Sequence, residues 1–320
     1  MQFDKIKIIK NRSDIGVGTR GSDMGIDAIE IAAINLNNQY FNNYDCEDIP
    51  THNESIYDKV NTTFAKRIGH VSEQCTRISK SIETNLKARI FPIILSGDHS
   101  SALGTLSGVK AAFRDKRIGV VWIDAHADIH SPYTSPSGNV HGMPLAAALG
   151  IDNKELQVNE VTDETLSHWN DMKNIGVIGP KVLPEDLIYF GVRDTEEPEN
   201  KQIEQLRILN YKVEELRDKG LNFCVAEAIE RLSPCEAIYI TFDVDSMDCD
   251  LISRGTGTPV ANGFDQYEVI SIMERFISTN KVVCIEFAEI NPLLDLAGNK
   301  MAETAFQVLN AVTKKMEEKR

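Results

Sequence analysis

The sequence predicts an α/β protein with an open, mostly parallel central sheet and helices on both of its faces. Short apolar segments rich in β-branched residues recur along the 320-residue chain. They lack the apolar–polar alternation of a half-exposed strand, and predominantly apolar segments of this length are typical of strands buried on both faces. Segments that suit helices lie between them, and strands that alternate with helices form parallel sheets.

The individual strands are expected at residues 90–95, 118–123, 187–191, 237–242 and 282–288. Helices are expected at residues 101–115, 200–209, 222–232 and 266–279. The last helix should start after Asp265, whose side chain can accept hydrogen bonds from the first turn. Residues 41–60 are expected to form a polar surface loop, 151–185 an irregular excursion, and 314–320 a charged helix end. Because no linker or repeat divides the chain, we expect a single domain over residues 1–320.

The charge of the chain excludes some classes of partner. With 34 Lys and Arg against 48 Asp and Glu, the formal net charge is −14. Nucleic acids and anionic membranes are bound by clustered Lys and Arg, so we expect neither partner and favour metal ions or a cationic small molecule. The six cysteines form no Cys-x-x-Cys pair, no signal peptide is visible, and no apolar run approaches the ~20 residues that span a bilayer. We therefore expect a cytoplasmic protein.

Acidic residues and histidines follow three of the predicted strands. They are His99, Asp124, His126, Asp128, Asp243 and Asp245. An Asp after a strand most often caps a helix or closes a turn, and this is the alternative for each residue taken alone. Alternation, however, places neighbours such as Asp124 and His126 on one side of an extended chain, and ligands collect at the carboxyl ends of parallel strands. Carboxylates that converge there would be costly unless a cation lies among them.

The types of donor narrow the choice of ion. Carboxylate oxygens dominate the set, whereas structural zinc prefers Cys and His. Oxygen donors with some imidazole suit Mn²⁺, with Fe²⁺, Co²⁺ or Mg²⁺ as alternatives. Six ligands that include four carboxylates are too many for one catalytic ion with an open position. Two ions bridged by an Asp and by a hydroxide derived from water fit this set better.

The segments around these residues resemble the metal-binding signatures of a known superfamily. They read Ser96-Gly97-Asp98-His99-Ser100, Asp124-Ala125-His126-Ala127-Asp128 and Thr241-Phe242-Asp243-Val244-Asp245-Ser246-Met247-Asp248. In this order they resemble the ureohydrolases, which comprise arginases, agmatinases, guanidinobutyrases and formimidoylglutamases. The resemblance covers roughly residues 90–310. It implies a three-layer α/β/α sandwich, two manganese ions bound by the six residues above, hydrolysis by a hydroxide that bridges the ions, and a homo-oligomer, commonly a trimer or hexamer.

Further residues resemble substrate contacts of the arginase branch. In the loop 135–144, the resemblance implies that Ser137 and Asn139 bind the α-carboxylate of the substrate. It also implies that Glu289 pairs with the guanidinium, and that Glu196 holds the α-amino group with one methylene more than the usual Asp. His130 stands where arginases carry an Asn that contacts the carboxylate, and a histidine can still donate to a carboxylate.

Two residues are expected to move protons. The resemblance implies that Asp128 takes up the proton of the attacking water and supplies it to the leaving nitrogen. His141 would act as a shuttle to solvent, because histidine titrates near pH 6.5. The alternative for His141 is a loop histidine with structural hydrogen bonds only.

The chain departs from the family pattern at two further places. Cys249 stands where a Pro is usual, so we expect a looser turn with an exposed thiol near the site. The segment 16–25 has glycines but lacks the usual Gly-Pro ending. Neither departure removes a predicted metal ligand.

The expected reaction is the hydrolysis of the guanidino group of L-arginine to L-ornithine and urea. Because His130 alters the substrate end of the pattern, the hydrolysis of agmatine, guanidinobutyrate or formimidoylglutamate is an alternative. A non-catalytic, metal-stabilised protein of the same fold is a third hypothesis. The presence of all six metal ligands together with His141 and Glu289 argues against it.

Overall fold

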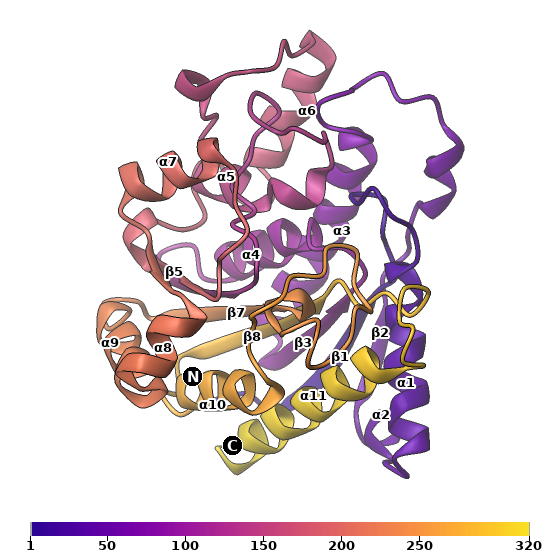
Figure 1. The fold of residues 1–320 in the computed structure, drawn as a ribbon, viewed down its shortest axis with the longest axis vertical. Helices are drawn as coiled ribbons and strands as arrows, with labels where there is room; N and C mark the ends of the chain where they lie inside the picture. The colour runs from indigo at the N-terminus through magenta and orange to yellow at the C-terminus, as the bar shows by residue number, and fades with distance from the viewer. Residues whose placement is uncertain (1, 320) are drawn as a thin grey trace.

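The computed structural model describes residues 2–319 and shows one parallel sheet between two layers of helices (Figure 1). Within the described residues, eight strands follow one another across the sheet in the order β2-β1-β3-β8-β7-β4-β5-β6. The strands are β1 (Lys5–Asn11), β2 (Asp45–Asp48), β3 (Ile90–Ser96), β4 (Ile118–Ile123), β5 (Leu187–Phe190), β6 (Leu209–Tyr211), β7 (Ala237–Asp243) and β8 (Val282–Ala288). The predicted α/β class with a parallel sheet is confirmed.

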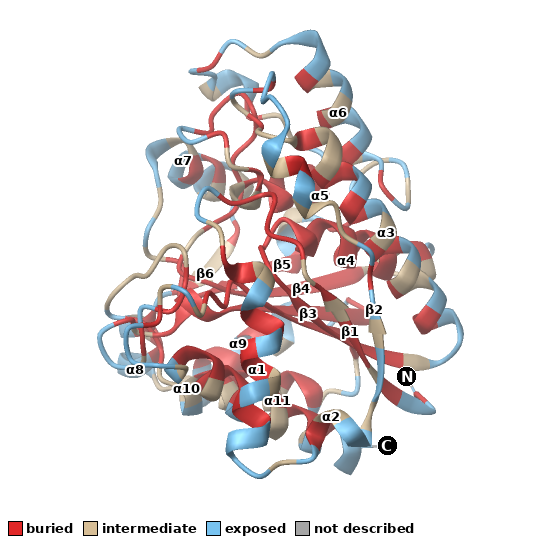
Figure 2. Ribbon diagram, turned by 90° about the vertical axis from the view of Figure 1, so that its right-hand side faces the viewer, coloured by how far each residue is buried: buried red, intermediate tan, exposed pale blue. Residues whose placement is uncertain are grey.

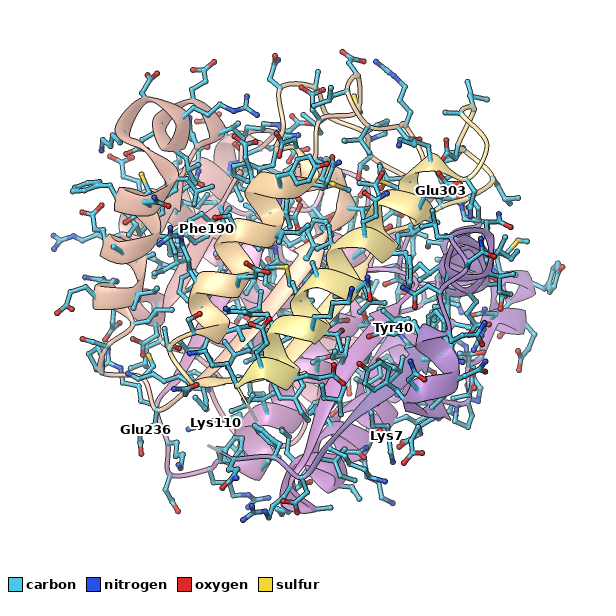
Figure 3. The ribbon with its side chains drawn as sticks, turned by 90° about the horizontal axis from the view of Figure 1, so that it is seen from below. Lys7, Tyr40, Lys110, Phe190, Glu236 and Glu303 are labelled. Atoms are coloured by element: carbon cyan, nitrogen blue, oxygen red, sulfur yellow. The ribbon has the colours of Figure 1, made fainter. Side chains whose placement is uncertain are left out.

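The helices divide between the two faces of the sheet (Figure 2). On one face lie α3 (Ile68–Lys87), α4 (Ser101–Ala112), α5 (Pro144–Leu149) and α6 (Asp163–Lys173). On the other lie α1 (Gly25–Asn35), α9 (Leu221–Arg231), α10 (Gln266–Ile277) and α11 (Lys300–Glu318), with α10 and α11 side by side (Figure 3). The remaining α-helices in residues 2–319 are α2 (Tyr40–Asn43), α7 (Glu197–Leu206) and α8 (Val213–Lys219). None of the helices in residues 2–319 combines the length and the apolar character needed to cross a bilayer.

The four central strands form the core, because they are apolar on both faces and helices cover both faces. Every residue of β4, β7 and β8 is buried, and in β3 only the first residue is partly exposed. The observed bounds of β4 and β8 are those predicted, and β3 and β7 extend one residue further, to Ser96 and Asp243. Asp265 caps α10 as expected, since its side chain accepts hydrogen bonds from the N–H groups of Tyr267 and Glu268.

The edge formed by β1 and β2 was not predicted, and the expectation of a plain loop over residues 41–60 is wrong. β2 has the sequence Asp-Cys-Glu-Asp and is largely exposed, so it carries no apolar signal. It is joined to β1 by parallel backbone pairing, and charged side chains also pair across the two strands. Lys5 lies 2.5 Å from Asp45, and Lys7 lies 3.1 Å from Glu47. Such pairs join residues about 40 positions apart, and a local pattern cannot reveal them.

Residues 151–185, expected to be irregular, contain α6 and a loop that a buried lysine holds together. The Lys181 side chain is 1% exposed, and its Nζ donates to the carbonyl oxygens of Lys173, Val177 and Gly179 at 2.6–2.7 Å. Burial lowers the pKa of Lys181 to about 8. The three carbonyl acceptors compensate the ammonium group for its lost hydration and order this loop.

The order of the strands determines what lies at the carboxyl edge of the sheet. β3, β8, β7 and β4 are neighbours in space although they come from distant parts of the chain. Since all are parallel, the residues that follow them meet at one edge. His99 follows β3, Glu289 follows β8, Asp243 ends β7 and Asp124 follows β4.

Candidate metal centre and active-site pocket

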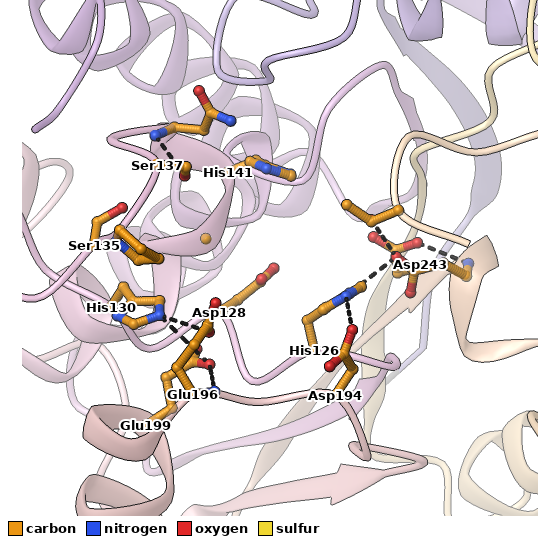
Figure 4. A pocket seen from close by; sticks show the side chains of 15 residues that line it. His126, Asp128, His130, Ser135, Ser137, His141, Asp194, Glu196, Glu199 and Asp243 are labelled. Carbon is orange, nitrogen blue, oxygen red and sulfur yellow. Dashed lines mark hydrogen bonds and ion pairs between the residues drawn. The ribbon is translucent and has the colours of Figure 1, made fainter. Parts of the chain in front are cut away.

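A pocket of about 300 Å³ opens at this edge, and most of the predicted site residues line it (Figure 4). The predicted residues in its walls are His126, Asp128, His130, Ser137, Asn139, His141, Glu196, Asp243 and Asp245. The other three, His99, Asp124 and Glu289, are almost completely buried, and each lies within 3.2 Å of a wall residue or of another member of this set. The structure thus brings all the residues predicted from the sequence to one place.

His99 points at three carboxylates. Its Nδ1 atom lies 3.0 Å from an oxygen of Asp124, 3.0 Å from one of Asp128 and 3.2 Å from one of Asp243. Its other ring nitrogen, Nε2, lies 2.8 Å from the hydroxyl of Thr241, so a proton on Nε2 leaves Nδ1 unprotonated. Nδ1 is buried and has no hydrogen-bond partner. An unprotonated nitrogen among three carboxylate oxygens is a set of donors that suits a metal cation.

A second group of donors shares Asp124 with the first. Nδ1 of His126 lies 3.0 Å from Oδ2 of Asp245 and 3.6 Å from Oδ1 of Asp124. The other oxygen of Asp124, Oδ2, faces His99. The donor atoms of His99, Asp124 and Asp128 all lie within 4.8 Å of one another, and so do those of Asp124, His126 and Asp245. Asp124 therefore lies between two groups, each of a size that can surround one ion.

The electrostatics of the two groups fit divalent cations. Burial and the neighbouring Asp124 carboxylate raise the pKa of Asp128 to about 6. Burial, with Asp245 and Asp124 nearby, raises the pKa of Asp243 well above its usual range. Buried carboxylates shift in this way when like charges are crowded without enough positive charge among them. Two ions such as Mn²⁺ would supply that charge, and oxygen donors with imidazole suit them.

Glu289 connects the loop after β3 to His141. Its Oε1 atom accepts hydrogen bonds from the backbone N–H of His99 at 2.9 Å and from Nδ1 of His141 at 3.1 Å. No hydrogen bond from the described residues reaches its other oxygen, Oε2, so this atom can accept one from a ligand. Glu289 has a φ of 67°, which is strained for a residue with a side chain and is typical of functional sites.

The pair of His141 and Glu289 predicts a pH dependence of stability. Burial lowers the pKa of His141, but the hydrogen bond and the charge of Glu289 outweigh it and raise the pKa to about 9. The unfolded value is near 6.5, so the stabilising contribution is complete below about pH 6.5 and is lost as the pH rises through about 9. In protein stripped of metal, the difference in urea midpoint between wild type and His141→Asn should therefore shrink over this range. A difference that stays constant or grows would contradict the pairing.

His130 lies against the start of α7. Its Nε2 atom is 3.0 Å from Oε2 of Glu196 and 3.5 Å from Oε2 of Glu199, and its Nδ1 atom is 3.1 Å from the hydroxyl of Thr134 (Figure 4). Both ring nitrogens therefore have protein partners. A direct hydrogen bond from His130 to a substrate carboxylate would require one of these partners to move.

Glu199 is a pocket residue that the sequence analysis missed. It is buried, and burial raises its pKa to about 8. Glu196 and Glu199 also form the capping box of α7, in which each side chain accepts a hydrogen bond from the backbone N–H of the other. The Glu-x-x-Glu spacing before a helix was the signal available in the sequence, but it indicates a helix start and does not identify a pocket residue.

The loop 135–139 packs on the segment 62–66. The backbone N–H of Lys66 donates to the carbonyl oxygen of Gly138 at 2.7 Å, and the Ser137 hydroxyl accepts a hydrogen bond from the N–H of Asn139 at 3.1 Å. Gly138 has a φ of 71°, and a Cβ atom there would lie 2.1 Å from the carbonyl oxygen of Thr63. Only glycine can be accommodated at position 138, because any Cβ atom would collide with this carbonyl oxygen.

We therefore expect Gly138→Ala to lower the melting temperature by about 5 °C or more, because the new methyl group must displace backbone in addition to adopting a strained φ. Gly142→Ala in the same loop is the matched control, since an added Cβ meets nothing within 4 Å there. Thermal unfolding of both variants measures the effect. Equal melting temperatures would show that the loop does not depend on the contact with Thr63.

The expectation of an exposed thiol at Cys249 is wrong. Its side chain is buried, with the residue 6% exposed, and burial raises its pKa. The Sγ atom lies 3.8 Å from Oδ1 of Asp250 and does not line the pocket. The turn after Asp248 closes over the thiol because backbone hydrogen bonds tie Asp248 to Phe264 and Cys249 to Val260.

The fold and the site define an α/β protein with a candidate two-metal centre at the carboxyl edge of its sheet. The sequence profile of the arginase family matches residues 4–313, and the chain belongs to this family. The arginase of Bacillus subtilis (strain 168) is 32% identical over 309 residues, which are 96% of this chain and 97% of that protein.

Solved structures agree with this assignment. The arginase of Bacillus caldovelox superimposes with a TM-score of 0.82 at 32% identity, over 96% of this chain and 97% of the other. The arginase of Entamoeba histolytica in complex with L-ornithine superimposes with a TM-score of 0.80 at 25% identity, over 98% of each chain. The similarity therefore extends over almost the entire chain, including the β1–β2 edge that the sequence analysis missed.

Proposed function

We propose that this protein hydrolyses L-arginine to L-ornithine and urea. The observation that carries the proposal is the pair of histidine–carboxylate groups that share Asp124 at one edge of an acidic pocket. A pocket lined by Asp128, Asp194, Glu196 and Glu199 suits a substrate that carries a guanidinium and an ammonium group. The relatives named arginase, one of them in complex with L-ornithine, support this choice of substrate.

The proposed metal ligands are the six residues of the two groups, with Mn²⁺ as the proposed ion and Fe²⁺ or Co²⁺ as alternatives. One ion would be held by His99, Asp128 and Asp243, and the other would be held by His126 and Asp245. Asp124 would contribute to both sites. When bound, two such ions lower the pKa of a water molecule far enough to provide hydroxide at neutral pH.

The side chains around the ions would bind the guanidinium and move protons. Glu289 would accept a hydrogen bond from the guanidinium through Oε2 and so orient its central carbon toward the metal site. Asp128 is buried beside the proposed metal site, and a carboxylate at that position can take up a proton and return it to the leaving amine. His141 has a side chain that is 20% exposed and is paired with Glu289, so it can pass protons between the pocket and solvent.

The far end of the pocket would bind the amino-acid head group. Glu196 and Glu199 offer carboxylates to the α-ammonium, and Ser137 and Asn139 offer donors to the α-carboxylate. We assign His130 the role of orienting Glu196, because its Nε2 atom is already 3.0 Å from that carboxylate. The same contact favours the alternative that the substrate is a different guanidino or formimino compound, since it changes the head-group end.

Steady-state assays of the Mn²⁺-loaded protein with L-arginine, agmatine, guanidinobutyrate and formimidoylglutamate test the proposal. We expect kcat/KM for L-arginine to exceed those for the other three. A higher value for one of the others would identify the alternative substrate and refute arginine as the natural one. No turnover of any member, with two equivalents of metal confirmed in the protein, would refute the enzymatic function.

The proposal also covers the domain organisation, the oligomeric state and the cellular location of the protein. The chain would form a single catalytic domain, supported by the one sheet to which all described strands belong. It would assemble into a homo-oligomer, either a trimer or a hexamer, and would work in the cytoplasm. Light scattering coupled to size-exclusion chromatography would determine the oligomer, and a monomer would contradict it.

A further inference from the structure

The two walls of the pocket differ in their negative charge. Asp194, Glu196 and Glu199 lie on the α7 side, whereas Ser137 and Asn139, from the loop 135–139, are uncharged. Among residues 2–319, Lys66 is the only lysine or arginine whose side chain forms a hydrogen bond or ion pair with a side chain that lines the pocket. Lys66 therefore places a positive charge beside the uncharged side of the wall, next to Asn139.

Lys66 belongs to the segment that supports the loop 135–139. Its Nζ atom donates to Oδ1 of Asn139 at 3.4 Å, while its backbone N–H donates to the carbonyl oxygen of Gly138 at 2.7 Å. The backbone contact places the side chain beside the loop, and the tight approach of Gly138 to Thr63 leaves the segment little freedom to shift. Lys66 is therefore held beside Asn139 by contacts that do not involve its charge.

The contact also orients the amide of Asn139. An ammonium group donates and cannot accept, so the atom that faces Lys66 must be Oδ1. The NH₂ group, which is the donor end, then lies on the other side of the amide, next to Gly18. Lys66 thus has two effects on the pocket wall, because it selects the orientation of a donor and places a positive charge behind it.

From this geometry we propose that Lys66 makes the pocket select substrates with an α-carboxylate over the corresponding decarboxylated amines. The inference rests on the proposed function and extends it to a residue outside the pocket wall. Lys66 acts through Asn139 and through its charge, and is therefore a positioning residue. The acidic wall opposite would bind the α-ammonium of an amino acid and the cation of a simple amine alike, so the discrimination has to come from the carboxylate side.

Agmatine is the suitable probe, because it is L-arginine without the α-carboxylate. In Lys66→Met, we expect KM for L-arginine to rise about 10-fold, since a charge-assisted hydrogen bond is worth about that factor, with kcat changed less than about twofold. The inhibition constant of agmatine against L-arginine should change less than about twofold. Lys66→Arg, which keeps the charge and the donors, should restore most of the affinity for L-arginine.

Lys59→Met is the matched control, because Lys59 lies seven positions before Lys66 and, within the described residues, its side chain has no hydrogen bond or ion pair with the pocket wall; it should leave both constants unchanged. Melting temperatures and metal content of all variants show whether each protein is folded and loaded. Equal changes in the constants for L-arginine and agmatine in Lys66→Met, or no change in either, would overturn the inference. A wild-type protein that hydrolyses no arginine would instead refute the proposed function, and the inference with it.

Discussion

Replacing Asp124 with asparagine is expected to abolish the binding of the proposed pair of metal ions and to lower kcat at least about 1000-fold. Among residues 2–319, Asp124 is the one carboxylate within ion-pair distance of both His99 and His126, with Oδ2 at 3.0 Å from His99 and Oδ1 at 3.6 Å from His126. An amide oxygen carries no net charge, and the NH₂ group of asparagine would place a donor where one of the two groups needs an acceptor. Both groups should therefore lose affinity together.

Two measurements check this expectation. Elemental analysis of Asp124→Asn after dialysis should find fewer than two metal ions per chain, and arginine turnover should fall as stated. Asp171→Asn, at an exposed position in α6, is the control for the loss of one negative charge and should retain both metal and activity. Two tightly bound ions with wild-type kcat in Asp124→Asn would show that the proposed ligand assignment is wrong.

Glu289→Gln should lower kcat/KM for arginine about 100- to 1000-fold while leaving the fold intact. Glutamine has nearly the same shape, and its oxygen can still accept the hydrogen bond from the N–H of His99. It removes the negative charge that would pair with the guanidinium and that raises the pKa of His141. Both substrate orientation and proton transfer would suffer, so the loss should exceed that of a single hydrogen bond.

The pH profile gives this variant a distinct signature. Without the carboxylate, the pKa of His141 should fall from about 9, so the apparent pKa of any step that uses the imidazolium should move downward. Glu236→Gln, in an exposed turn before β7, is the control for the substitution itself. A kcat/KM within threefold of wild type in Glu289→Gln would remove Glu289 from the proposed mechanism.

Much of the site was predictable because its residues are local extensions of strongly patterned strands. The segments at 118–123 and 282–288 have the same bounds in the sequence analysis and in the structure, since each is short, predominantly apolar and rich in β-branched residues, as buried strands are. A polar residue that directly follows such a strand must lie at the edge of the sheet where the strand ends. Asp124 and Glu289 were thus placed at the carboxyl edge of the sheet before their partners were known.

The sequence did not reveal elements and contacts that depend on distant partners. β2 is charged and exposed, and it pairs in parallel with β1, whose Lys5 and Lys7 contact its carboxylates. Glu199 is recognisable in sequence only as part of a helix cap, and its place in the pocket depends on how α7 lies against His130. Cys249 was expected to be exposed, but backbone hydrogen bonds to the loop near residue 260 bury it.

The sequence by itself determined the α/β class, the central strands and the set of histidines and carboxylates that follow them, because each depends on side chains within a few positions of one another. The tertiary structure decided the order β3-β8-β7-β4, which makes neighbours of His99, Glu289, Asp243 and Asp124. It also decided that His130 faces Glu196 and that Lys66 lies behind Asn139. The first contact spans 66 positions of the sequence and the second spans 73, so only the packing of the whole chain can select them.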